Sequence, residues 1–150
     1  MRRLIIASLA IVVLFGIVLV TIGPGKSTAA TTTTTANTPV TSWNNRYGTI
    51  PLALSVDLTA LAGIQFGKPI NPDCAQLQYD VQNGQKAPSI PKTSLEQSWS
   101  GLLGQLNDLV TSCAGVVQDP SNQTSFASLR SQSQTLIAPV DRIISDLHAR

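Results

Sequence analysis

Hydrophobic residues recur at alternating three- and four-residue spacings through the second half of the chain. Such spacing places them on one side of a helix, so it predicts two long amphipathic helices. A single polar residue, Ser133, interrupts the pattern in the second helix. The apolar positions are Leu95, Trp99, Leu102, Leu106, Leu109, Cys113 and Val116 in the first helix, and Phe126, Leu129, Leu136, Val140, Ile143 and Leu147 in the second.

Local signals predict where these two helices begin and end. Thr93, with Glu96 three residues later, has the pattern of a capping box at the start of the first helix, and Asp119-Pro120 ends it. The second helix is expected from about residue 121 to 149. Pro139 cannot donate a backbone hydrogen bond, so we expect a kink or a restart there.

The segment 49–60 fits two patterns. Its apolar residues from Ile50 to Leu58 alternate with others as in a strand. A helix that Gly63 ends also fits the spacing of Trp43, Tyr47, Ile50, Leu54, Leu58 and Leu61. Pro51 disfavours a central strand and suits the first turn of a helix. We therefore expect a helix.

The segment 74–82 is ambiguous in the same way. Leu77, Tyr79 and Val81 alternate with polar residues before Asn83-Gly84, which is a hairpin signal. The preceding Asn71-Pro72, in contrast, is typical of a helix start, with Asn71 as the cap. Helix is favoured again, because no third strand would complete a sheet. The fold class expected is all-α, a small bundle of three or four helices.

The N-terminus carries an uncharged apolar run. Residues 4–22 contain sixteen apolar residues in nineteen and follow Arg2 and Arg3. A helix of that length spans about 29 Å, close to the hydrocarbon thickness of a bilayer. We expect residues 1–23 to be an uncleaved membrane anchor with the N-terminus inside the cell, and the rest of the chain outside. The alternative is a signal peptide cleaved near Ala29, which would release the protein.

A polar tether and a folded domain follow the anchor. Eight of the fourteen residues from Thr28 to Thr41 are Thr, so residues 24–41 cannot bury enough surface to fold and read as a stalk. Residues 42–150 form the expected extracytoplasmic domain. From residue 31 onward there are seven basic and eight acidic residues, a net charge of −1. This balance excludes the electrostatic basis of nucleic-acid binding.

Cys74 and Cys113 are the only cysteines, and both follow the predicted anchor. An even count in an exported chain predicts a disulfide. The two cysteines are 39 residues apart, and a disulfide that closes a loop of this length contributes about 4 kcal/mol to stability. A tight helical hairpin would leave the two cysteines about 13 Å apart along its axis. We therefore expect residues 86–91, which include two prolines, to run extended beside the next helix.

No residue pattern indicates catalysis, a cofactor or a metal. His148 is the only histidine, which excludes a His-based triad or a multi-His metal site within one chain. Ser89 and Lys92 match an S-x-x-K motif, but Pro91 breaks the helix that this motif requires. A glycosidase pair would have to come from scattered carboxylates without specific spacing, which are Asp57, Asp73, Asp80 and Asp108.

The anchor, the Thr-rich stalk, the run from Trp43 to Gly48 and the later Cys74, Trp99 and Cys113 resemble small uncharacterised envelope proteins of actinobacteria. The resemblance implies an envelope location and no activity. We expect a binding or structural module, not an enzyme, with the membrane and another envelope protein as partners. A hydrolase is a remote alternative. The alternative is a carrier of a lipid or other apolar ligand between helices, suggested by the aromatic residues Trp43, Tyr47, Phe66 and Trp99.

Overall fold

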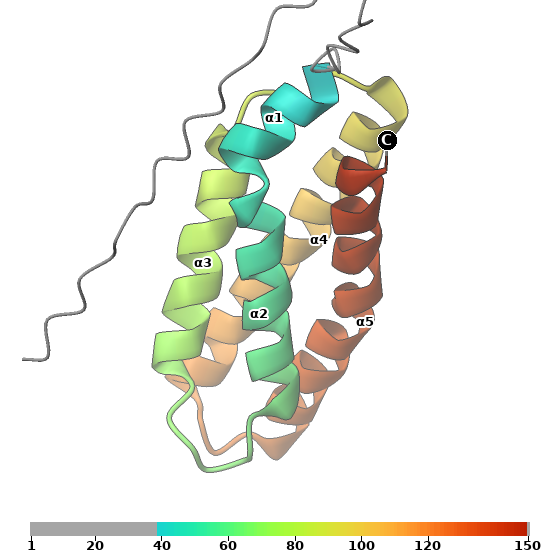
Figure 1. The fold of residues 1–150 in the computed structure, drawn as a ribbon. Coiled ribbons are helices and arrows are strands. Elements are labelled where there is room, and N and C mark those ends of the chain that lie inside the picture. The colour runs from blue at the N-terminus through green and yellow to red at the C-terminus, as the bar shows by residue number, and fades with distance from the viewer. Residues whose placement is uncertain (1–38, 150) are drawn as a thin grey trace, which may run out of the picture. The chain divides into compact units, whose positions relative to one another are not determined.

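The computed structural model describes residues 39–149 and is helical throughout its regular structure. These residues form five helices: α1 Pro39–Tyr47, α2 Thr49–Gly63, α3 Asn71–Lys86, α4 Thr93–Gln118 and α5 Gln123–His148 (Figure 1). The all-α expectation is confirmed for this part of the chain. The predicted anchor at residues 4–22 lies outside the described residues. Within residues 39–149, no helix combines the length and apolar character needed to cross a membrane.

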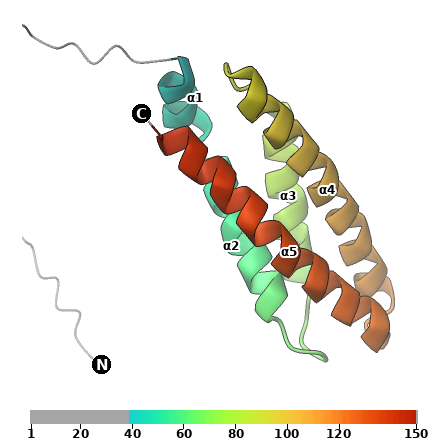
Figure 2. The ribbon, with the colours of Figure 1, turned by 90° about the vertical axis from the view of Figure 1, so that its right-hand side faces the viewer.

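The four longer helices make an up-down-up-down bundle. Each of them packs against two neighbours, so that α2 and α4 both contact α3 on one side and α5 on the other (Figures 1 and 2). Short connections of this kind favour antiparallel neighbours. The short helix α1 lies at the end of the bundle where α3 joins α4, and the connection from α2 to α3 lies at the opposite end.

The apolar faces predicted for the two long helices, which we call their seams, form much of the core. All seven positions predicted for α4 and all six for α5 are buried. Ser133 is fully buried as well, and its Oγ donates a hydrogen bond of 2.9 Å to the carbonyl oxygen of Leu129. The hydroxyl of the one polar residue on this apolar face is therefore hydrogen-bonded within its own helix. Helix α5 runs through Pro139 without interruption, so the predicted restart is wrong.

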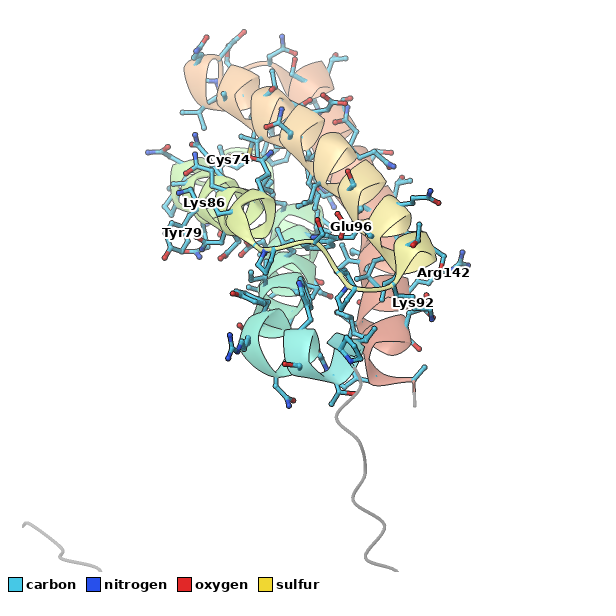
Figure 3. The ribbon with its side chains drawn as sticks, turned by 90° about the horizontal axis from the view of Figure 1, so that it is seen from above. Cys74, Tyr79, Lys86, Lys92, Glu96 and Arg142 are labelled. Atoms are coloured by element: carbon cyan, nitrogen blue, oxygen red, sulfur yellow. A yellow bond between two sulfur atoms is a disulfide. The ribbon has the colours of Figure 1, made fainter. Side chains whose placement is uncertain are left out.

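Both ambiguous segments are helices. Leu54, Leu58 and Leu61 point into the core of the bundle from α2. In α3, Leu77 and Val81 are buried, whereas Tyr79 is 61% exposed and points away from the bundle (Figure 3). A strand would have placed those three α3 residues on one face. The helical interpretation is confirmed in both cases.

The helix ends differ from the sequence expectation in four places. The segment from Trp43 to Gly63 is two helices, because the chain turns at Gly48, where a Cβ would collide with Asn44. Helix α3 begins at Asn71 itself, whose side chain does not cap it. The capping box at Thr93 is also absent, since Glu96 accepts instead from the backbone N–H of Ile90. Helix α1 lies partly within residues 24–41, the range assigned to the stalk.

A disulfide joins Cys74 near the start of α3 to Cys113 near the end of α4, with 5.7 Å between the two Cα atoms. The predicted pairing is confirmed. Helix α3 extends past Gly84 to Lys86, which reduces the expected mismatch in length. The connection of residues 87–92 spans the remainder, with extended backbone at Ala87 and Lys92. It begins one residue later than expected, because Lys86 belongs to α3, and it contains a tight turn in which Lys92 N–H donates to the carbonyl oxygen of Ile90.

Candidate functional site

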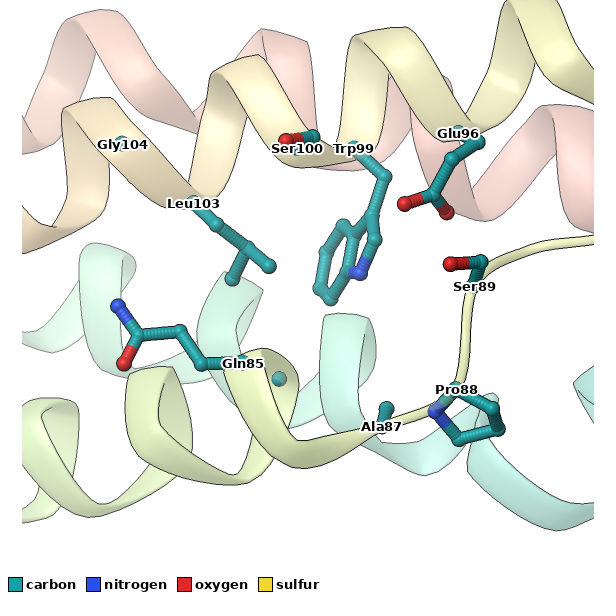
Figure 4. Close-up of a pocket in the computed structure, with 10 residues that line it drawn as sticks. Gln85, Ala87, Pro88, Ser89, Glu96, Trp99, Ser100, Leu103 and Gly104 are labelled. Carbon is teal, nitrogen blue, oxygen red and sulfur yellow. The ribbon is translucent and has the colours of Figure 1, made fainter.

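A surface groove of about 350 Å³ lies at the end of the bundle where α3 joins α4 (Figure 4). Three segments form its walls, namely the last turn of α3, the connection of residues 87–92 and the first three turns of α4. We call it the α3–α4 groove. Its lining residues are Gly84, Gln85, Ala87, Pro88, Ser89, Glu96, Trp99, Ser100, Leu103 and Gly104.

Gly84 sets the distance between the two helices under this groove. A Cβ at Gly84 would lie 2.8 Å from Cδ2 of Leu103 and 3.1 Å from Cζ2 of Trp99. Both distances are shorter than ordinary van der Waals contact, so a larger residue at Gly84 requires the side chains of Leu103 and Trp99 to shift. The Asn83-Gly84 signal therefore marks a close helix contact and not a hairpin turn.

Two hydrogen bonds hold the connection that forms the outer wall. Nε1 of Trp43, in α1, donates to the carbonyl oxygen of Pro88 at 2.6 Å. The backbone N–H of Ile90 donates to Oε2 of Glu96, also at 2.6 Å. Ile90 itself is buried in the core. The wall is thus anchored by α1, by α4 and by apolar contact, which gives the groove a defined shape.

The polar groups of the groove are mostly uncharged. The amide of Gln85 and the hydroxyls of Ser89 and Ser100 belong to exposed side chains and extend from the walls (Figure 4). Glu96 contributes the one carboxylate. Amide and hydroxyl groups both donate and accept, so this lining can hydrogen-bond an uncharged polar ligand, and the carboxylate disfavours an anion.

Three further surface grooves of about 260, 280 and 290 Å³ lie elsewhere on the bundle. The first lies where the α2–α3 and α4–α5 connections meet, and the other two lie between α4 and α5. The α3–α4 groove differs from them because a segment held by hydrogen bonds from two helices forms one wall. It is therefore the best-built candidate binding site among these grooves.

The aromatic residues that suggested an apolar carrier form two separate clusters. Trp43 packs against Tyr47 and Trp99, with ring centroids 5.5 Å and 6.4 Å away. Phe66 packs edge-on against Phe126, with centroids 5.3 Å apart, at the other end of the bundle. The four residues do not line one cleft, and both tryptophans are buried in the core.

The structure brings together carboxylates that lie far apart in the sequence. Asp57 of α2 and Asp80 of α3 are both buried and lie within hydrogen-bonding reach of each other. Burial, followed by the negative charge of Asp80, raises the pKa of Asp57 to about 7. Neither residue lines any of the four grooves described above. Their spacing of 23 residues gave no sequence signal, because the partners come from different helices.

The remaining sequence motifs are not brought into a common site. Ser89 lies in the extended connection and not on a helix, so the structure required for an S-x-x-K nucleophile is missing around it. His148 is exposed, and its Nδ1 donates to the carbonyl oxygen of Ile144. Among residues 39–149, no three carboxylate, histidine or cysteine side chains are grouped to hold a metal. No known protein family, curated protein or solved structure matches this chain.

Proposed function

We propose that this chain is an extracytoplasmic binding module. Residues 4–22 anchor it in the membrane, the Thr-rich segment serves as a stalk, and the helical bundle binds a partner through the α3–α4 groove. The observation that carries the proposal is the groove itself, a cavity of about 350 Å³ with amide, hydroxyl and carboxylate groups along walls held by Trp43 and Glu96.

The chemistry of the lining favours an uncharged polar segment of another envelope protein as the partner. A groove of this volume accommodates a few residues of an extended chain, and its donors and acceptors match peptide groups. The disulfide supports the extracytoplasmic location, because disulfides persist in oxidising compartments. The carrier hypothesis has less support, since its aromatic residues fill the core or pack on each other.

Glycine positions on α4 provide a matched test. A Cβ at Gly104, which lines the groove, or at Gly101, which lines none of the described grooves, would meet no atom within 4 Å. The probe is therefore a small aliphatic photo-crosslinking amino acid, whose Cβ fits at either position and which is much smaller than a tryptophan. In cells that express the full chain, the Gly104 variant should form a discrete crosslinked product that the Gly101 variant lacks.

Blocking the groove completes the experiment. When Ser100→Trp is added to the Gly104 crosslinking variant, the bulky side chain should abolish the product, because Ser100 is exposed on the groove wall. Equal crosslinking from Gly101 and Gly104, or a product that persists with the groove blocked, would rule out the groove as the binding site.

A further inference from the structure

Asp57 is an unusual residue for its position. It is the only charged residue among residues 49–63, yet just 8% of it is exposed. Asp80, on the facing helix α3, is 7% exposed. Buried carboxylates are rare unless a cation or hydrogen-bond donor compensates for their lost hydration. The charge on Asp57 and Asp80 therefore depends on which cations and hydrogen-bond donors lie next to them.

One carboxyl oxygen of Asp57 has no hydrogen-bond donor. Its Oδ2 is fully enclosed and receives no hydrogen bond from any N–H or O–H of the described residues. The carboxyl of Asp57 interacts with the carboxyl of Asp80, whose own Oδ2 accepts from Nε2 of Gln76 at 2.7 Å. Two carboxylates in such contact cannot both remain ionised at low cost, whereas one shared proton gives each a hydrogen bond.

The surrounding charged groups do not neutralise the negative charge of Asp57 and Asp80. Asp73, on α3, adds a second negative charge that acts on Asp57. From α5, Arg130 donates to the carbonyl oxygen of Ala62, and Asp141 accepts from Ser55. Arg46 of α1 is exposed, and α4 does not pack against α2. Every charged group that acts on Asp57 is therefore negative.

We propose that Asp57 and Asp80 form a proton-dependent clasp between α2 and α3. With one proton on the pair, the O–H of Asp57 donates to the carboxylate of Asp80 and joins the helices. When that proton leaves for solvent, two negative charges face each other in the interface, and α2 loosens from α3. The raised pKa of Asp57, about 7 compared with an ordinary 3.8, places this transition near neutral pH.

The covalent structure determines which helices respond. The disulfide between Cys74 and Cys113 ties α3 to α4. Helix α2 has no such link to α3 and is joined to it only by the connection of residues 64–70. Loss of the proton should therefore affect the α2–α3 interface while α3 and α4 stay together.

Urea unfolding of the full chain at pH 5 and pH 8 tests the clasp. Trp43 and Trp99 are the only tryptophans and both are buried in the bundle, so their fluorescence reports its unfolding. The unfolding equilibrium constant should rise at least about tenfold from pH 5 to pH 8 in the wild type, beyond any change in Asp57→Asn. At pH 8, Asp57→Asn should be the more stable protein, because its amide donates permanently to Asp80.

Two further variants keep the result interpretable. Asp80→Asn should reduce the excess pH dependence, because the charge of Asp80 is lost while Asp57 stays buried, whereas Asp141→Asn, an exposed carboxylate on α5, should keep it. Amide hydrogen exchange, corrected for its intrinsic pH dependence, should accelerate in α2 between pH 5 and pH 8 and stay constant around Cys113. Wild-type pH dependence in both Asp57→Asn and Asp80→Asn, or unchanged exchange in α2, would overturn the proposal.

Discussion

Adding one methyl group at Gly84 tests whether close helix packing shapes the α3–α4 groove. In Gly84→Ala the new Cβ would lie 2.8 Å from Leu103 and 3.1 Å from the ring of Trp99. Overpacking of this kind typically costs about 1–3 kcal/mol. Alanine also gains up to about 1 kcal/mol in helix propensity over glycine, which partly offsets that cost.

The matched control is Gly104→Ala on α4, where the new Cβ meets no atom within 4 Å. This variant gains helix propensity without a clash, so it should be more stable than the wild type by up to about 1 kcal/mol. Gly84→Ala should fall below Gly104→Ala by about 1–3 kcal/mol in urea unfolding followed by tryptophan fluorescence. Equal stability of the two variants would refute the close contact at Gly84.

Three other outcomes follow from the same structure. Reduction of the disulfide should lower stability by about 2–5 kcal/mol, and Cys113→Ser slightly more, because a hydroxyl then enters the core; thermal melts measure both. Trp43→Phe removes the hydrogen bond to Pro88 and should cost at least about 1 kcal/mol in urea unfolding, with faster hydrogen exchange in residues 87–92. The Asp57 carboxyl, whose pKa rises on folding, should favour the folded state most below pH 4 and lose up to about 4 kcal/mol as the pH rises through 7, measured by urea unfolding of the wild type and Asp57→Asn across that range.

The strongest sequence signals were local and periodic. The seams from Leu95 to Val116 and from Phe126 to Leu147 predicted two helices and their buried faces, including the gap at Ser133. The cysteine pair was also predictable, because only one pairing exists. These features depend on spacing within one helix or on an even cysteine count, which the sequence displays directly.

The missed features depend on tertiary contacts. Glu96 was expected to cap Thr93, but the folded connection brings the N–H of Ile90 to it instead. An Asn-Gly pair occurs both in hairpin turns and where two helices pack closely. Only the position of Leu103 on the facing helix shows that Asn83-Gly84 belongs to a close helix contact. Pro139 stands inside an uninterrupted helix, because the packing of α5 against α2 and α4 outweighs its helix-breaking tendency.

The buried carboxylate pair and the α3–α4 groove were the least predictable features. Asp57 and Asp80 come from different helices, and their contact follows from the antiparallel register of α2 and α3. One signal was present, since a single charge in an otherwise uncharged helix suggests a buried partner. The groove left no signal in its lining residues, because glycines, serines and glutamine at these positions also describe an ordinary exposed surface.

The central claim, a disulfide-closed bundle exposed outside the cytoplasm, can be tested by labelling a single thiol on intact cells. Gly101→Cys places an exposed thiol on α4, and the two native cysteines are paired, so the new thiol is the only free one. A membrane-impermeant maleimide should label this variant in intact cells and leave the wild type unlabelled until the protein is both reduced and denatured, because the native cysteines are paired and buried. Labelling of Gly101→Cys only after the cells are lysed, or of the wild type without reductant, would contradict the account.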